Sequence, residues 1–422
     1  MSERAARWIR LVLEFAVNQG ITQAAGMMSG LIYVRLMPVD QYALYAVGLT
    51  TLTFISMGSD LGLTGSIGYF WRQRLIGGSP VEPVIAAVRR LRSVLLIFAS
   101  VVCSVFLLKT AVTQNLPVTT VVACFGLAVA TAWSQTRTSI DLAIMRIEGM
   151  QRQSYYCEAA GSITRLLGAC AMIVTRISTA VFGLVGGLLG SFAVVIFIRS
   201  MASVPANSLQ PIGRETWREV LAYVRPMFPT MVVYMVQDPL IYWLTLTFGG
   251  EGPVSESFAV GRIAAIYGLL GNFIVTAVVP RLTCITDEAH LARMTAFILV
   301  VLVLLCLVAL IGTYLAPSVL LLLIGAKYSH LHREVVLSIA SASFGMLVTF
   351  LAVVNRLQGW VRLEPVVALC QVVAIFVLAS RWSFHESASV LGLMVVLAGF
   401  SFLGAFITSV VGLLEPRIVK SH

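Results

Sequence analysis

The sequence predicts an all-α polytopic membrane protein with about twelve transmembrane helices. Composition is the first reason, because 59% of the residues are hydrophobic, only 11% are charged and the mean hydropathy is +0.92. A soluble domain carries about 25% charged residues. The second reason is that several stretches contain no charged residue over more than the roughly 20 positions that a span needs. These stretches are 111–136, 177–198, 294–326 and 387–414.

The third reason is the distribution of the 29 Lys and Arg residues. If the joints between apolar stretches alternate between two sides of a bilayer, most of the basic residues fall on the side of the N-terminus. Basic loops stay in the cytoplasm. We therefore expect a multi-pass protein of the bacterial cytoplasmic (inner) membrane with both termini cytoplasmic. The net charge of +10 then belongs to rims that face anionic lipid headgroups, and we expect no nucleic-acid partner.

The expected spans follow the apolar stretches in order, and each ends at a polar, Gly- or Pro-containing joint. All should be helices, because a strand exposed to lipid leaves its backbone groups unsatisfied. In the first half the spans are 8–36, 42–70, 93–113, 117–133, 155–175 and 180–198. In the second half they are 222–248, 258–279, 296–316, 335–354, 365–380 and 388–414.

The two halves of the chain look related. The loop 199–221 divides the chain near its midpoint, and residues 45–48 (YAVG) and 258–261 (FAVG) each open the second span of their half. An even number of spans per half predicts parallel repeats about an axis along the membrane normal. We therefore expect two six-helix bundles, 1–205 and 206–422, related by a pseudo-twofold axis along the membrane normal, with a substrate cleft between them.

Ionisable residues at membrane depth are costly and are candidate functional residues. Asp60 lies in a glycine-rich span and points away from the glycine face, so it should meet water or a cation, or else form a structural salt bridge or stay protonated. Arg165 lies about 15 Å into its span, near the midplane. It either pairs with a helix carboxylate or awaits an anionic substrate, for which phosphate suits its geometry.

The remaining candidates lie on the first, seventh and eighth spans. Arg262 and Asp238 lie at comparable depth, so they either pair with each other or line the outer half of the cleft. Glu14 either pairs with Arg10, one turn away, or belongs to a polar stripe on the first span. Asn18 and Gln23 are further candidates in that stripe, which should face protein or water rather than lipid.

Several kinds of chemistry have no motif in the sequence. There is no P-loop, HExxH or G-x-S-x-G motif, and the seven cysteines have no metal-ligand spacing. His330 and His332 are interpreted as surface residues of a short outer loop. We therefore expect a protein that is not an enzyme and that has no catalytic residues, no metal site and no cofactor.

The first hairpin carries a resemblance to a known family. Residues 35–45 (RLMPVDQYALY) and 60–63 (DLGL) resemble the opening of bacterial polysaccharide (O-antigen) flippases. These form the polysaccharide transport branch of the multidrug/oligosaccharidyl-lipid/polysaccharide exporter superfamily. Ala43 stands where the family usually has Gly, and Asp40 where it has Glu. Weaker similarities lie at 258–263, 280–282 and 323–328.

The resemblance implies a flippase for undecaprenyl-pyrophosphate-linked oligosaccharide, moved from the cytoplasmic to the outer leaflet for O-antigen, capsule or exopolysaccharide (lipopolysaccharide-type) synthesis. It implies a cleft lined by helices 1, 2, 7 and 8, which carry Glu14, Asp60, Asp238 and Arg262. The phospholipid bilayer surrounds it, a polysaccharide polymerase and glycosyltransferases are candidate partners, and the carboxylates are candidates for proton or sodium coupling.

Three rival functions stay open. A cation-coupled multidrug exporter of the same superfamily predicts an acidic cleft with no need for Arg165. A membrane-embedded polysaccharide polymerase predicts a long functional outer loop, for which the short segment 328–334 is the only candidate. A purely structural or assembly role needs no charges at depth.

Overall fold

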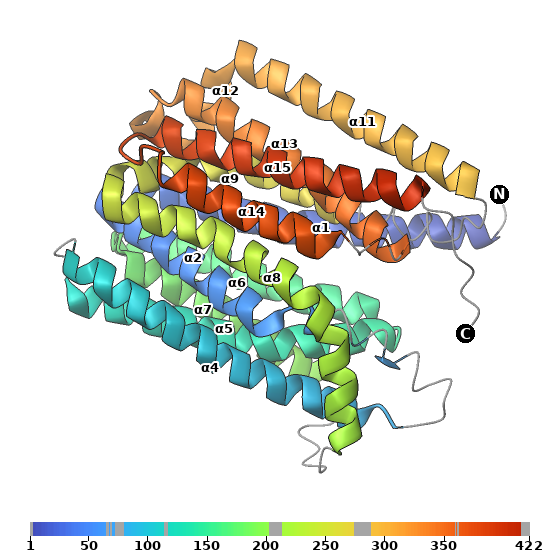
Figure 1. Cartoon of the computed structure of the whole chain (residues 1–422). Helices are drawn as coiled ribbons and strands as arrows, with labels where there is room; N and C mark the ends of the chain where they lie inside the picture. The colour runs from blue at the N-terminus through green and yellow to red at the C-terminus, as the bar shows by residue number, and fades with distance from the viewer. Residues whose placement is uncertain are drawn as a thin grey trace. The chain divides into compact units, whose positions relative to one another are not determined.

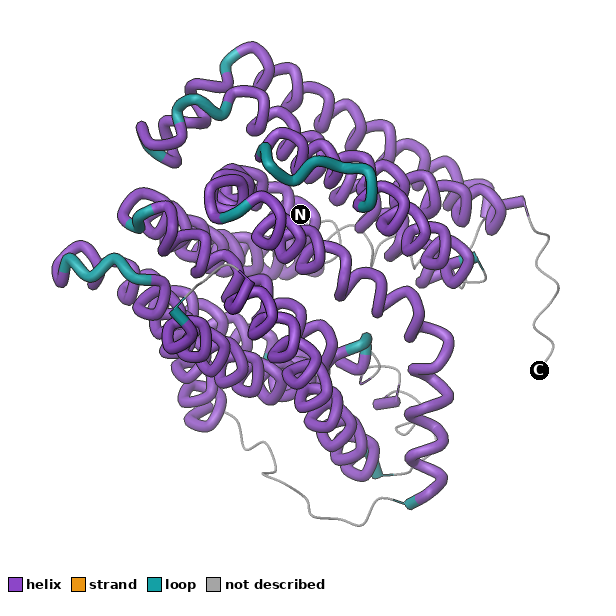
Figure 2. Tube along the Cα trace, turned by 60° about the vertical axis from the view of Figure 1, so that its left-hand side comes forward, coloured by secondary structure: helices purple, strands orange, loops and turns teal. Residues whose placement is uncertain are grey.

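The computed structural model describes residues 3–64, 67, 70–71, 80–113, 117–201, 213–273, 288–358, 360 and 363–414. These residues form helices joined by short turns, and none of them lies in a strand (Figure 2). The predicted all-α membrane fold class is confirmed. Among the described residues, seven helices are long and apolar enough to cross a membrane: Val118–Ile147, Gln151–Thr175, Ala180–Met201, Met231–Gly249, Ala292–Leu315, His332–Asn355 and Ser387–Leu413.

The chain forms two compact units, Met1–Ser255 and Glu256–His422. The first unit holds α1 (Glu3–Leu36), α2 (Val39–Asp60), α4 (Glu82–Thr113), α5 (Val118–Ile147), α6 (Gln151–Thr175), α7 (Ala180–Met201) and α8 (Arg214–Gly249) (Figure 1). The second holds most of α9 (Glu251–Phe273) and then α11 (Glu288–Leu315), α12 (Pro317–Ile324), η2 (Ala326–Tyr328), α13 (His332–Gln358), α14 (Glu364–Ala379) and α15 (Ser387–Leu414).

This division differs from the expected one at residues 205 and 206. The physical reason is α8, which packs against α2 and α4 and therefore belongs to the first compact unit. Packing of this kind leaves no trace in the hydropathy pattern of α8. The grouping into two six-helix repeats at 1–205 and 206–422 stays a prediction.

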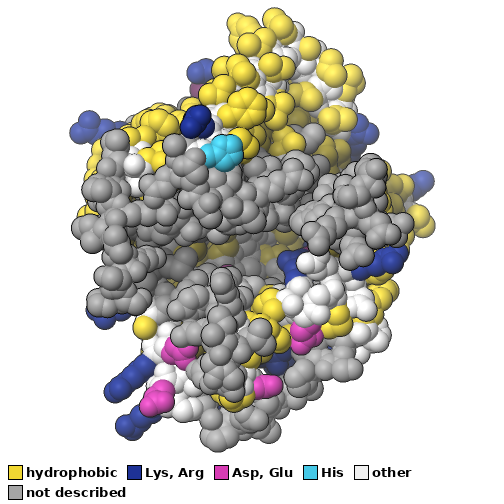
Figure 3. Space-filling view, turned by 90° about the vertical axis from the view of Figure 1, so that its right-hand side faces the viewer, with side chains coloured by type: hydrophobic (Ala, Val, Ile, Leu, Met, Phe, Trp, Pro, Cys, Tyr) yellow, Lys and Arg dark blue, Asp and Glu magenta, His cyan; other side chains and the backbone are white. Residues whose placement is uncertain are grey.

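Several helices run beyond their expected spans into polar sequence. α4 begins at Glu82 instead of residue 93, and α5 ends at Ile147 instead of residue 133. An apolar run ends at the first charge, whereas a helix continues wherever its charged residues find partners. Charged side chains of both signs gather at the end of the molecule where α8 begins, which Figure 3 views end-on.

Glycine contacts bring α6 and α7 close together along their length. A Cβ on Gly190 would lie 2.7 Å from the carbonyl oxygen of Gly161, and a Cβ on Gly168 would lie 3.1 Å from the Cα of Gly186. Small residues of this kind allow close backbone approach between membrane helices. α1 packs against α6, the first helix of this pair.

Gly190→Ala is therefore expected to destabilise the protein by about 1–3 kcal/mol, because the new methyl group meets backbone that cannot rotate away. Gly187→Ala is the matched control on the same helix, since no heavy atom lies within 4 Å of its new Cβ. The control should be neutral or slightly stabilising. Unfolding of the two purified variants in detergent measures the difference, and equal stability would contradict the close packing.

The hairpin that carries the family resemblance is a packing unit. Tyr45 lies between Tyr33 and Tyr42, with ring centroids 5.0 and 6.0 Å away. The Gln41 side chain accepts a hydrogen bond from the backbone N–H of Ala180 at 3.2 Å, so it caps the first turn of α7. Burial and the nearby Asp40 carboxylate raise the pKa of Glu251, in the turn between α8 and α9. Gln41 and the three tyrosines therefore hold α1, α2 and α7 together at this end of the first unit.

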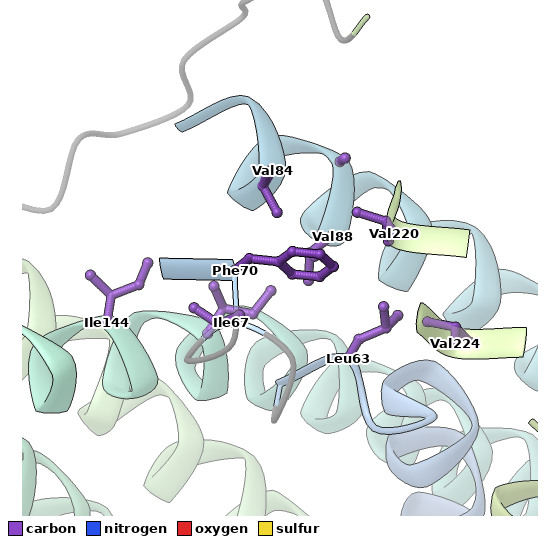
Figure 4. Close-up of a cluster of buried hydrophobic side chains, with 10 residues drawn as sticks. Leu63, Ile67, Phe70, Val84, Val88, Ile144, Val220 and Val224 are labelled. Carbon is purple, nitrogen blue, oxygen red and sulfur yellow. The ribbon is translucent and has the colours of Figure 1, made fainter. Parts of the chain in front are cut away.

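A hydrophobic cluster holds the chain that follows α2 against α4, α5 and α8 (Figure 4). Phe70 is 1% exposed and lies at its centre, beside the valines of α4 and α8. The labelled members are Leu63, Ile67, Phe70, Val84, Val88, Ile144, Val220 and Val224. Burying such side chains contributes about 1.5–3 kcal/mol each, so this cluster anchors the segment directly after Asp60.

In the second unit, α13 packs along α15, and α11 and α14 pack against these two helices. Asn355 of α13 joins them, because its Nδ2 donates to the carbonyl of Ala405 at 2.9 Å and its Oδ1 accepts from Ser409 at 2.6 Å. Gln371 of α14 donates to Ser401 of α15. Such bonds between helices contribute about 0.6–2 kcal/mol each in a bilayer.

Candidate functional site

The second helix breaks at Asp60, where the expected span 42–70 was continuous. α2 ends at Asp60, and the next two residues are left-handed, with φ of 40° at Leu61 and 81° at Gly62. Glycine adopts this conformation freely, whereas Leu61 is strained in it. The Asp60 carboxylate accepts hydrogen bonds from the backbone N–H of Thr64, at 3.1 Å, and from the Thr64 hydroxyl. Asp60 therefore caps the helical turn that follows the break.

Asp60 forms an ion pair with Arg92 of α4. The Arg92 Nη2 lies 3.4 Å from the Asp60 Oδ1, and the two side chains are 4% and 31% exposed respectively. The Arg92 Nη1 donates to Thr64 at 2.8 Å and to Ser139 of α5 at 2.7 Å. Several interpretations of Asp60 were open, and the structure shows the salt bridge. The partner, Arg92, was expected to lie in the loop before the span that begins at residue 93.

Polar contacts continue along the same three helices. Ser56 donates to Gln135 at 3.2 Å, and Ser59 and Thr136 are hydrogen-bonded at 3.0 Å. Nearer the expected cytoplasmic ends, Arg89 of α4 pairs with Asp141 of α5 at 2.6 Å. These bonds form a polar seam between α2, α4 and α5, in which side chains of neighbouring helices bond to each other. Within the described residues, the buried Nε of Arg92 has no hydrogen-bond acceptor.

A second polar seam joins α1, α5 and α6. Gln19 of α1 donates to the Glu158 carboxylate at 3.2 Å, and Arg146 of α5 pairs with its other oxygen at 2.6 Å. Asn18 and Gln23 are half-buried on α1, whereas Val17, Ile21 and Met28 are exposed. The polar stripe expected on the first span therefore lies toward protein at Gln19, and Gln23 is one turn further along the same face.

Arg165 lies on α6, two turns beyond Glu158 and about 15 Å from the C-terminal end of that helix. Its Cβ packs against Gly190 of α7. Its Nε is buried without a hydrogen-bond acceptor, and within the described part of the chain Arg165 forms no ion pair. It contrasts with Arg89, Arg92 and Arg146, each of which has a carboxylate partner. Arg165 is thus a cationic group near the middle of a helix long enough to span a membrane, and no described neighbour neutralises its charge.

Of the three expected site residues that remain, only Arg262 has a described side chain. Arg262 of α9 is half-buried, and its guanidinium lies 4.6 Å from the ring centroid of Phe258, one turn earlier. The side chains of Glu14 and Asp238 lie outside the described residues, so their expected pairing with Arg10 and Arg262 stays a prediction. His330 is 61% exposed and lies 3.3 Å from Glu256, as a residue of an outer loop.

Sequence reasoning missed five charged residues of these seams, namely Arg89, Arg92, Asp141, Arg146 and Glu158. Arg92 directly precedes an expected span, and Asp141 lies about two turns beyond the end of another, within the same helix. The available signal was that a carboxylate such as Asp60 at depth requires a cation near its own level. Within the described residues, no group of three or more His, Cys, Asp or Glu side chains could hold a metal ion.

No protein-family model matches the sequence, and no curated protein matches it either. Several solved structures do resemble it over nearly its whole length. An inward-facing multidrug resistance MATE family transporter of the MOP superfamily has a TM-score of 0.66 at 13% identity, with 93% of each chain covered. The lipid II flippase MurJ, in an inward closed conformation, has a TM-score of 0.65 at 10% identity, covering 95% of this chain and 89% of its own.

A MOP superfamily transporter from Pyrococcus furiosus, described as having a binding pocket of reverse polarity, has a TM-score of 0.65 at 13% identity, with 96% and 94% of the two chains covered. All three are described as transporters or flippases, and identities this low establish the fold and not the substrate. The chain therefore has the fold of the MOP superfamily transporters.

Proposed function

We propose that this protein is a flippase that moves undecaprenyl-pyrophosphate-linked glycan units from the cytoplasmic to the outer leaflet for surface polysaccharide synthesis. The observation that carries the proposal is Arg165, a guanidinium at midplane depth without a described carboxylate partner. A pyrophosphate cannot enter hydrocarbon without compensating charge. Arginine binds phosphate oxygens through two parallel hydrogen bonds, so Arg165 offers this headgroup a partner halfway across the bilayer.

The resemblance of residues 35–45 and 60–63 to polysaccharide flippases supports the same substrate class, and so does a fold shared with a lipid II flippase. In this proposal the polyprenyl tail stays in the bilayer while the headgroup crosses beside the polar faces of the helices. The protein lies in the bacterial inner membrane with both termini in the cytoplasm. Glycosyltransferases that build the lipid-linked unit and a polymerase that consumes it are the proposed partners.

The alternative of a cation-coupled multidrug exporter shares the fold, because MATE transporters are equally similar. A cation exporter needs free carboxylates at depth. Among the described residues, Asp60, Asp141 and Glu158 each pair with an arginine. These pairs favour an anionic substrate over a cationic one, and coupling to protons or sodium stays a proposal for Asp60, Asp238 and Glu14.

Deletion of the gene tests this proposal in the cell. The deletion strain is expected to lose surface polysaccharide and to accumulate lipid-linked oligosaccharide in the inner leaflet, and a plasmid copy should restore both. Susceptibility to cationic dyes is measured in parallel. Unchanged surface glycan together with increased dye sensitivity would reject the flippase and favour the multidrug exporter.

A further inference from the structure

One carboxylate in the first unit interacts with three arginines from three helices. Asp141 of α5 pairs with Arg89 of α4 at 2.6 Å, and it also interacts electrostatically with Arg137 of α5 and Arg199 of α7. We call these four residues the Asp141 cluster. One carboxylate neutralises only one guanidinium, so the cluster is cationic. Arg137 and Arg199 are both exposed at the surface of the unit.

The two exposed arginines lie at the same depth. Arg137 follows the first residue of α5, Val118, by the same number of residues as Arg199 follows the first residue of α7, Ala180. At 1.5 Å per residue this places each about 28 Å from the outer end of its helix. The hydrocarbon core of a bilayer is about 30 Å thick. With the orientation that the distribution of basic residues predicts, both guanidinium groups lie at the level of the inner-leaflet headgroups.

Each arginine lies one turn beyond an exposed apolar side chain of its own helix. On α7 an apolar stripe runs through Leu189, Phe192 and Ile196, which are 52%, 40% and 64% exposed, and Arg199 follows one turn later on the same face. On α5, Trp133 is 45% exposed, and the Arg137 guanidinium lies 4.3 Å from its ring centroid. Tryptophan is typical of the membrane–water interface. Since α5 packs against α7, the stripe of α7 and Trp133 of α5 both lie next to the Asp141 cluster.

We propose that this surface of α5 and α7 is a binding site for an anionic phospholipid of the inner leaflet. The lipid phosphate lies between Arg137 and Arg199, Trp133 packs at the glycerol level, and an acyl chain follows the apolar stripe of α7. The cluster recognises the lipid by charge at the headgroup and by apolar contact along the chain. A zwitterionic lipid lacks the net charge, and inorganic phosphate lacks the chain. The proposal is independent of the transported substrate.

Binding to purified full-length protein tests the proposal. Native mass spectrometry or tryptophan quenching measures the affinity for phosphatidylglycerol, with phosphatidylcholine and inorganic phosphate as the comparison ligands. Each basic residue near a membrane surface contributes about fivefold in affinity for anionic lipid. The double variant Arg137→Gln/Arg199→Gln is therefore expected to bind phosphatidylglycerol about 30-fold more weakly, with phosphatidylcholine binding unchanged.

Arg152→Gln is the matched control. Arg152 is an exposed arginine of α6 on the same rim, stacked at 5.7 Å on Tyr156, and it lies outside the Asp141 cluster. This control should keep wild-type affinity. If Arg152→Gln weakens binding equally, the lipid responds to the general charge of this surface and not to a specific site, which overturns the proposal. Wild-type affinity in the double variant would overturn it as well. If the double variant does not fold, each single variant should lose about fivefold. Phosphate binding as tight as that of the lipid would reject a lipid site.

Discussion

Arg165→Ala is expected to reduce glycan export at least about 30-fold while leaving the amount of folded protein in the membrane unchanged. Truncating one partner of a buried charge pair costs about 2–5 kcal/mol, and the lower end of this range corresponds to roughly 30-fold. The amount of folded protein should stay unchanged, because Arg165 has no ion pair within the described structure to break. Surface glycan on cells that express the variant in the deletion strain measures the loss.

Two further substitutions serve as comparisons for Arg165→Ala. Arg165→Lys keeps the charge without the planar fork and should retain part of the export. Arg176→Gln removes an exposed arginine at the C-terminal end of the same helix and should leave export unchanged. If Arg165→Ala exports normally at normal protein levels, the arginine has a structural role and the main support for a phosphorylated substrate is lost.

The second large effect concerns stability at the break in α2. Asp60→Ala is expected to destabilise the protein by about 3 kcal/mol, because it leaves the buried Arg92 guanidinium without a counter-charge. It also removes the cap of Thr64. Replacing both partners, as in Asp60→Leu/Arg92→Met, should cost less than Asp60→Ala alone, since an apolar pair leaves no isolated charge.

Unfolding in mixed detergent micelles measures these differences. Asp40→Ala is the control, because Asp40 is an exposed carboxylate whose removal should change the unfolding free energy by about 0.5 kcal/mol or less. If the double variant is as unstable as the sum of its single variants, the Asp60–Arg92 pair does not act as a unit. The same cycle separates the structural role of Asp60 from a role in ion coupling, since loss of coupling lowers transport without lowering stability.

The helical fold and most of the spans could be predicted because a bilayer leaves a chain few alternatives. Uncharged stretches such as 177–198 and 387–414 are helices, as expected. The ends of α4 and α5 could not be predicted from apolar runs, because Arg89 and Asp141 neutralise each other inside helical segments. A hydropathy profile assigns each of these residues to a loop between two spans.

The sequence pattern also could not predict the break in α2 at Leu61 and Gly62. We expected Gly62 to be a packing residue on the glycine face of the second span. Its φ of 81° instead makes it part of a turn. The search for charges at depth identified Asp60 and Arg165. It missed Arg92 and Glu158, because partners on neighbouring helices follow no fixed spacing along the chain and become visible only when the helices are packed.

Reconstitution into proteoliposomes tests the central claim most directly. Purified protein is incorporated with a fluorescent polyprenyl-pyrophosphate oligosaccharide, and a membrane-impermeant quencher or glycosidase reports how much reaches the opposite leaflet. The account predicts that the wild-type protein moves this lipid and that the Arg165→Ala protein moves it at least about 30-fold more slowly. Transport of a cationic dye without any movement of the pyrophosphate-linked glycan would contradict it.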